Sequence, residues 1–431
     1  MLMDTDIVLH PIPKRQLSSN THGYLPDFPP ELLHIIFWYA TRTPRALERA
    51  RREASYVPFQ DSGWKYTLIT QIRARKEDWE VKTAISLVCK TWNSIVTEFV
   101  FEEITIGPCA PSLEMLDMFG HWVRRLELQP VETENCSIRL IDILSRCPRL
   151  EILAKLSSAD LDSPKFWSGF NDYEPPSLHC LRRVDWTSSH PDCGPEVCHA
   201  SESAFMSIVA HAPNLNHLSS SSTLLLGKLF DKNEVPLSPL NIIRFPVACV
   251  DHLRLNPSSE PLCPMPRPFR VPCLTHVIID NAVIHSLCHL SQLPQFPQVA
   301  VLELQDGVFL EATRLSILFH VFPKCEELAL PAGHAHIINH ESSRHAAKKY
   351  YASIKRIRLF ASPFGPLRSL NAWMKVHAHV LFTECFPAVD TVFLHGDWRF
   401  TVTAQLLRGL KSMLHERSCW LVYENGSPVV S

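Results

Sequence analysis

The sequence predicts an α/β protein in which a small helical module precedes a solenoid of helix-turn-strand units with a curved parallel sheet. Three observations predict it: an apolar pattern that recurs along most of the chain, prolines ahead of many copies of that pattern, and two amphipathic segments before the first copy. We expect residues 1–24 to be disordered, residues 25–106 to form the helical module, and residues 107–431 to form the solenoid.

The recurring pattern is an apolar residue, two variable residues, an apolar residue, one variable residue and a last apolar residue. Its clearest copies follow a proline and are Val299-Leu302-Leu304, Cys325-Leu328-Leu330 and Val389-Val392-Leu394. The alternation at its end predicts a strand that buries one face, and the preceding proline ends any helix before it. Copies begin roughly 22 to 35 residues apart, which is within or just above the period of leucine-rich repeats.

Other segments fit the same frame less regularly, namely Val123-Leu126-Leu128, Leu181-Val184-Trp186, Leu215-Leu218-Ser220, Leu240-Ile243-Phe245, Val250-Leu253-Leu255, Leu274-Val277-Ile279 and Ile354-Ile357-Leu359. The copy that begins at Leu150 is imperfect because Lys155 takes its third apolar position. Apolar spacing predicts intervening helices at Ile138 to Arg146, Glu202 to His211, Glu311 to Val321 and Asn371 to Cys385. The asparagine of regular leucine-rich repeats is mostly missing, so the predicted array is irregular, and an ordinary parallel α/β domain is the alternative.

The helical module begins where Pro30 and Glu31 favour helix initiation, because a first-turn proline loses no needed donor and an acid there complements the helix dipole. The helix that follows carries an apolar stripe of Leu32, Ile35, Ile36 and Tyr39. A second helix is expected from Val81 to Phe99, with Ile85, Val88, Trp92, Ile95 and Phe99 on one face. A charged insertion at about residues 42–82 separates the two helices.

This module resembles the F-box through Leu25-Pro26, Pro30-Glu31-Leu32, Ile35-Ile36-Phe37, Leu87-Val88-Cys89-Lys90, Trp92, and an exit into repeats from Phe101 to Ile106. Its form is similar to that of F-box-like proteins of filamentous and mushroom-forming fungi. The resemblance covers residues 25–106 closely and the rest of the chain loosely, as irregular repeats. It departs from the family at the insertion, since typical F-boxes join these helices by a short link.

The resemblance implies a substrate-receptor subunit of an SCF-type ubiquitin ligase, which docks on a Skp-type adaptor and through it on a cullin, and which binds a client protein through its repeats. The adaptor-binding residues that it implies are Leu25, Pro26, Pro30, Leu32, Ile35, Ile36, Leu87, Val88 and Trp92. The residues alone leave a second possibility open, in which Leu32, Ile35, Leu87 and Val88 pack against the first repeats. The alternative function is a leucine-rich-repeat interaction scaffold that is not attached to a ubiquitin ligase.

Each predicted strand aims the residue between its last two apolar positions away from the core, so these side chains should form an exposed concave face. We expect the client to bind there, at Glu127, Asp185, Arg254, Glu303, Arg358 and Phe393. Mixed charge with an aromatic side chain favours a protein client over a nucleic acid.

Composition and motifs argue against several other classes of function. The 42 Lys and Arg residues nearly balance the 44 Asp and Glu residues, so no global field favours nucleic acid or anionic lipid. We expect no catalytic residues and no cofactor, because phosphate-loop, zinc-helix and nucleophile-elbow motifs are absent from the sequence. No apolar run reaches the roughly 18 residues that span a bilayer, and Asp4 and Asp6 interrupt any signal-peptide pattern. A cytoplasmic or nuclear location with reduced cysteines is therefore expected.

One group of metal-ligand side chains is dense in the sequence and consists of His190, Cys193, Cys198 and His199. Structural zinc sites use paired Cys-x-x-Cys or spaced His-His knuckles, which this group lacks. We therefore expect a solvated loop between repeats and no bound metal.

Overall fold

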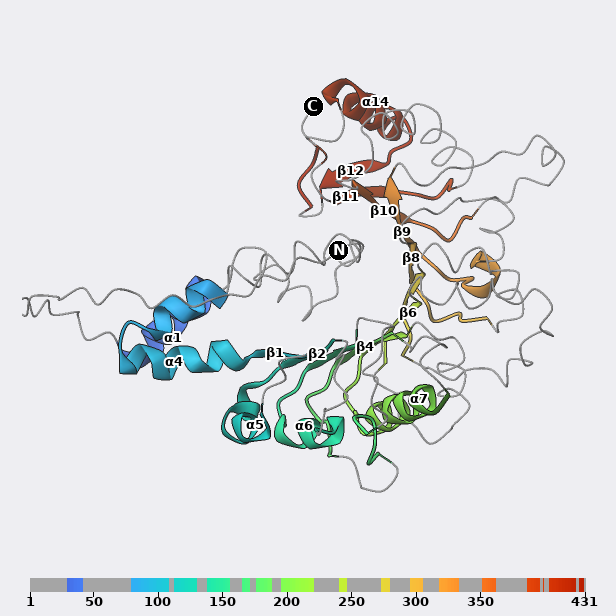
Figure 1. Ribbon diagram of the computed structural model, residues 1–431. Helices are drawn as coiled ribbons and strands as arrows, with labels where there is room; N and C mark the ends of the chain where they lie inside the picture. The colour runs from blue at the N-terminus through green and yellow to red at the C-terminus, as the bar shows by residue number, and fades with distance from the viewer. Residues whose placement is uncertain are drawn as a thin grey trace, which may run out of the picture.

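The computed structural model of the chain describes residues 29–41, 79–107, 112–129, 138–155, 165–170, 176–187, 195–220, 240–245, 273–279, 295–304, 318–332, 351–361, 386–395, 398, 403–423 and 426–429. Its main feature is an open sheet of twelve strands, in which the strands follow one another in sequence order. All neighbouring strands are parallel. The sheet bends along its length, and helices lie on its outer side (Figure 1). The predicted α/β class and curved parallel sheet are confirmed.

The strands are β1 (Glu103–Ile106), β2 (Arg125–Leu128), β3 (Ile152–Lys155), β4 (Arg183–Trp186), β5 (His217–Ser220), β6 (Ile242–Phe245), β7 (His276–Ile279), β8 (Val301–Leu304), β9 (Glu327–Ala332), β10 (Arg356–Ala361), β11 (Thr391–His395) and β12 (Trp420–Tyr423). The helices are α1 (Pro30–Ala40), α4 (Lys90–Phe101), α5 (Leu113–Phe119), the 3-10 helix η1 (Gly120–Trp122), α6 (Leu140–Arg146), α7 (Pro195–Ala210) and α14 (Ala404–His415). Successive strands begin 22 residues apart at the closest, from Glu103 to Arg125, and 35 at the widest, from Arg356 to Thr391.

The apolar frame forms the core of the sheet. In the copy that ends in β8, Val299, Leu302 and Leu304 are fully buried, and the framed residues of the other described copies join them in one continuous hydrophobic cluster. The strand register sets Leu302 beside Leu328, so each repeat covers the apolar residues of the next. Burying a leucine stabilises a fold by about 1.5 to 3 kcal/mol, so stacking of units can hold the array together.

A turn of the same kind precedes most of the described strands. The first framed residue donates its backbone N–H to the residue three positions earlier, as from Val299 to Phe296 at 3.2 Å and from Cys325 to Phe322 at 3.2 Å. The residue three positions earlier is itself buried in several copies, as at Cys147, Phe296 and Phe386. The repeat therefore has a fourth apolar position that the sequence analysis did not include.

The imperfect copy also forms a strand. Lys155 ends β3 on the core side and is buried, and its Nζ donates a 2.7 Å hydrogen bond to the carbonyl oxygen of Thr187. The same ammonium lies 5.8 Å from the ring centroid of Trp167 and 5.9 Å from that of Trp186. Two aromatic faces and a carbonyl thus solvate a charge that would otherwise be costly to bury.

The predicted intervening helices are confirmed in part. Helix α6 matches its prediction closely, whereas α7 begins at Pro195, ahead of the predicted start at Glu202, because proline suits a first helical turn. Cys198 and His199 therefore lie in a helix, which corrects the expected loop. Residues 318–321 are helical within the third prediction. The fourth prediction (Asn371 to Cys385), the Val250 copy, His190 and Cys193 lie outside the described residues.

Candidate docking surfaces

The two N-terminal helices α1 and α4 pack on each other through a small core of Leu33, Phe37, Val96 and Phe99. The ring of Phe37 meets the edge of Trp92 with centroids 4.9 Å apart. On the rim of this core, His34 Nε2 lies 3.3 Å from Glu98 Oε2. Four buried apolar side chains make a thin core for a module of this kind, since small units bury too little surface to be stable alone.

Most of the apolar side chains of this helix pair lie outside its core. We name the apolar face as Leu32, Ile35, Ile36 and Tyr39 of α1 together with Leu87 and Val88 before α4. The four residues of α1 are 47% to 60% exposed, and Leu87 and Val88 are 75% and 52% exposed. Exposed apolar residues at positions i, i+3, i+4 and i+7 of one helix, as in α1, mark a surface that binds other molecules.

The continuous second helix predicted from Val81 to Phe99 is wrong. Residues 79–86 are helical, Leu87 and Val88 form a turn, and α4 starts after Cys89. Cys89 has an extended backbone, and its Sγ accepts a 3.5 Å hydrogen bond from the N–H of Trp92, as a helix cap does. Asn93 Nδ2 donates to the carbonyl of Ser86 at 3.2 Å and so satisfies the end of the preceding helix. This break is what turns Leu87 and Val88 outward.

The structure divides the predicted adaptor-binding residues into three groups. Leu32, Ile35, Ile36, Leu87 and Val88 lie on the apolar face, and Pro30 is exposed in the first turn of α1. Trp92 instead packs against Phe37 and is half-buried, so its first role is in the helix-pair core. Leu25 and Pro26 lie outside the described residues.

Helix α4 joins the helix pair directly to the sheet. Its last residue, Phe101, stacks on Phe119 at 4.3 Å, and Phe119 stacks on Trp122 at 5.6 Å. The backbone N–H groups of Arg124 and Arg125 donate to the carbonyl of Glu102 at 2.9 and 3.0 Å. These contacts attach the module to the first strand, and Figure 1 shows α1 and α4 beyond that end of the sheet.

The face of the sheet opposite the core carries the charged residues, and we call it the polar face. Arg183 Nε lies 2.7 Å from Asp185 Oδ2, and His217 Nε2 lies 3.7 Å from the other oxygen of the same carboxylate. His276 Nε2 lies 3.6 Å from Glu303 Oε2. The same strand or a neighbouring one thus places a basic group within reach of each of these acids, which lowers the cost of removing the acid from water.

This pairing corrects the predicted client-binding set. Glu127, Asp185 and Glu303 lie opposite the core, as expected, but all three are buried, and Glu303 has 0% of its surface exposed. Strands about 4.8 Å apart bring their side chains into contact, so paired charges on an inward-curving face cover one another. Arg358 and Phe393 are half-buried and Arg254 lies outside the described residues.

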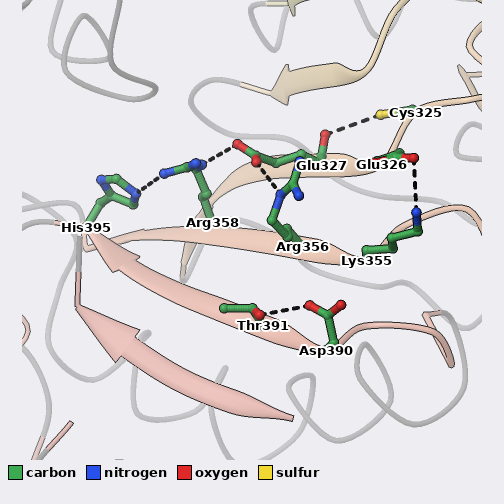
Figure 2. Close-up of polar contacts among 9 residues, drawn as sticks. All are labelled: Cys325, Glu326, Glu327, Lys355, Arg356, Arg358, Asp390, Thr391 and His395. Carbon is green, nitrogen blue, oxygen red and sulfur yellow. Dashed lines mark hydrogen bonds and ion pairs between the residues drawn. The ribbon is translucent and has the colours of Figure 1, made fainter. Parts of the chain in front are cut away.

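The polar face is more open at β10 to β12. Glu327 accepts hydrogen bonds from Arg356 Nε at 2.8 Å and from Arg358 Nε, and Arg358 also contacts His395 Nε2 at 3.2 Å (Figure 2). The Arg358 guanidinium lies 4.7 Å from the ring centroid of Phe393. Burial alone would raise the pKa of Glu327, but the hydrogen bonds and charges of Arg358 and Arg356 outweigh it and hold that pKa below its ordinary value.

The remaining reactive groups show no catalytic arrangement within the described part of the chain. Burial raises the pKa of the Cys147 and Cys325 thiols to about 12, so these thiols stay protonated and unreactive. Among the same residues, no group of three or more His, Cys, Asp or Glu side chains is placed to hold a metal ion. None of the described helices has the length and apolar character needed to cross a membrane. In comparisons with known proteins, no family model and no curated sequence matches this chain.

Proposed function

We propose that this chain is a substrate-receptor subunit of an SCF-type ubiquitin ligase. Its apolar face docks on a Skp-type adaptor, and through it on a cullin, while an irregular leucine-rich-repeat solenoid holds a client protein. The observation that carries the proposal is the position of the apolar face, which lies on the two segments that resemble the F-box.

The energetics favour a permanent or frequent partner for this face. Burying a leucine or isoleucine that is now half-exposed contributes about half of the roughly 1.5 to 3 kcal/mol of full burial. Covering Leu32, Ile35 and Leu87 therefore supplies part of the roughly 8 kcal/mol that micromolar binding requires, and the other residues of the interface supply the rest. The same partner would complete the thin core of the helix pair.

The assignment of adaptor docking to one surface and client binding to another follows from where the apolar and charged side chains lie. A mainly apolar surface suits one constant partner, because its binding depends on shape and apolar contact. The polar face keeps charged and aromatic side chains partly exposed at β10 to β12, which suits recognition of one particular client. This division implies a non-catalytic protein of the cytoplasm or nucleus, where the ligase works.

Binding of a purified Skp-type adaptor tests the proposal. We expect Ile35→Asp and Leu87→Asp each to abolish adaptor binding, because each places a charge in an apolar interface. Met118→Asp is the matched control, since Met118 on α5 is 58% exposed and lies outside the apolar face. Circular dichroism would show that all three variants stay folded. Undiminished adaptor binding by both face variants would overturn the proposal, and client recovery without adaptor or cullin would favour the scaffold alternative.

A further inference from the structure

The open end of the polar face has the features of a specific binding site. Eight residues of the last three strands share this face, and six of them precede Phe360 and His395 along the strands: Arg356, Arg358, Thr391, Phe393, Trp420 and Val422. The register sets Arg356 beside Thr391 and Thr391 beside Trp420, so a guanidinium and an indole stand one strand apart on either side of a threonine. We call these six residues the terminal patch.

The terminal patch has an excess of positive charge. Two guanidinium groups share the single carboxylate of Glu327, which leaves a net charge of +1 in a chain whose formal net charge is −2. Arg356 meets Glu327 through Nε, and its side chain is 40% exposed. Among the described residues the terminal NH groups of Arg356 have no partner, so they can donate to an incoming anion. Glu327 and Phe393 meanwhile hold Arg358 in place.

An aromatic surface lies next to this charge. Trp420 is 67% exposed although it is the largest type of apolar side chain, and Phe393 is half-buried beside Arg358. The edge of β12 is closed to an added strand, because the backbone N–H of Tyr423 donates to Ser427 at 2.8 Å and that of Val429 donates to Leu421 at 3.2 Å. Recognition at this end therefore uses side chains of the face and not the strand edge.

We propose that the terminal patch binds a peptide segment of the client that carries an acidic side chain and an aromatic side chain about three residues apart. The carboxylate would meet Arg356 and the ring would stack on Trp420. Two strand spacings separate these residues by roughly 10 Å. Three residues of a peptide in the polyproline II conformation span about the same length and return the side chain to the same side. This inference rests on the proposed function, since it names the chemistry of the client.

A single-stranded nucleic acid would also find arginine and aromatic side chains here. The small charge of the patch disfavours it, because a net charge of +1 matches a single acid, whereas a nucleic acid carries a phosphate on every nucleotide. A peptide with one or two acids matches that charge. Charge complementarity therefore favours the peptide.

The test measures fluorescence anisotropy of a labelled random copolymer of Glu and Tyr with the full chain. Arg356→Gln and Trp420→Ala are each expected to weaken binding about tenfold, which is the usual effect of losing one charged or aromatic contact at an interface. Lys355→Gln is the matched control. It removes the same charge from the residue next to Arg356, and the exposed side chain of Lys355 pairs with Glu326 instead. Polyglutamate should bind more weakly than the copolymer, since it lacks rings.

Equal binding of the copolymer by the wild type and by Arg356→Gln would overturn the inference, as would displacement of the copolymer by polyuridine at comparable concentration. Adaptor binding by the same variants separates this inference from the proposed function. A chain that binds the adaptor but not the copolymer refutes the client chemistry alone. A chain that binds the copolymer through Arg356 but never binds the adaptor refutes the ligase role and still supports the terminal patch as a peptide-binding site.

Discussion

The helix pair and the sheet differ in how far they bury their apolar residues. In the sheet, each framed residue is covered by the equivalent residue of the next repeat, as Leu302 is by Leu328. In the helix pair, four residues form the core while a larger number of apolar residues stay exposed. The repeats of the sheet therefore bury one another's apolar residues, whereas the exposed apolar residues of the helix pair are buried only when another molecule covers them.

Cysteine reactivity should show the largest difference between the two regions. Cys89 is exposed and directly follows Leu87 and Val88 of the apolar face, whereas Cys147 and Cys325 are buried in the repeats with thiol pKa values raised to about 12. At pH 8 only about one such thiol in ten thousand is ionised, and the thiolate is the reactive form. Mass-spectrometric mapping after brief iodoacetamide treatment should find Cys89 modified and both sheet thiols intact.

Adding the adaptor sharpens this experiment. If the apolar face is the docking surface, bound adaptor should protect Cys89 while exposed Cys180, in the turn before β4, stays reactive. Rapid modification of Cys325 in the folded chain would mean that the repeat core opens far more readily than its packing implies.

Replacing a leucine with alanine should lower the free energy of unfolding by several kcal/mol more in the sheet than in the helix pair. Leu328→Ala removes a fully buried side chain between β8 and β10 and should lower the free energy of unfolding by about 2 to 5 kcal/mol. Leu87→Ala removes a side chain that is 75% exposed and should change it by less than about 0.5 kcal/mol. Urea denaturation measures both. A large loss in Leu87→Ala would show that Leu87 belongs to a core and not to a docking surface.

How much of the fold could be predicted from the sequence also differs between the sheet and the helix pair. The positions of Leu302, Leu328 and Val392 could be predicted because a period-two pattern behind a proline is a local property that the sheet repeats. The break at Cys89 could not, because neither glycine nor proline marks it and a cysteine rarely caps a helix. The burial of Glu303 depends on a histidine in the neighbouring strand, and the sequence does not show which residues will face each other across strands.

Adjacent acids at the start of β9, Glu326 just before the strand and Glu327 as its first residue, should show how far the polar face differs from an ordinary surface. Glu327 has a side chain only 5% exposed and holds two arginines, whereas Glu326 is 43% exposed and pairs with the exposed Lys355. Glu327→Gln should lower the free energy of unfolding by about 1 to 3 kcal/mol, because Arg356 and Arg358 lose a charged partner. Glu326→Gln should cost less than about 1 kcal/mol, as exposed pairs usually do. Equal effects in urea denaturation would contradict the difference in burial.

The pH dependence of the stability difference between wild type and Glu327→Gln is the smallest expected effect and the most specific one. Arg358 and Arg356 hold the pKa of Glu327 below the ordinary value of 4.5, so the folded chain keeps this carboxylate ionised at pH values where the unfolded chain has begun to protonate it. A depressed pKa in the folded state adds stability that is fully present above the unfolded-state pKa and disappears as the pH falls through the folded-state pKa. The stability gap between wild type and Glu327→Gln should thus stay constant from pH 7 to about pH 5 and shrink below that. Glu326→Gln provides the baseline, and a gap that widened on acidification would mean that Glu327 is held protonated by its burial and not ionised by its arginines.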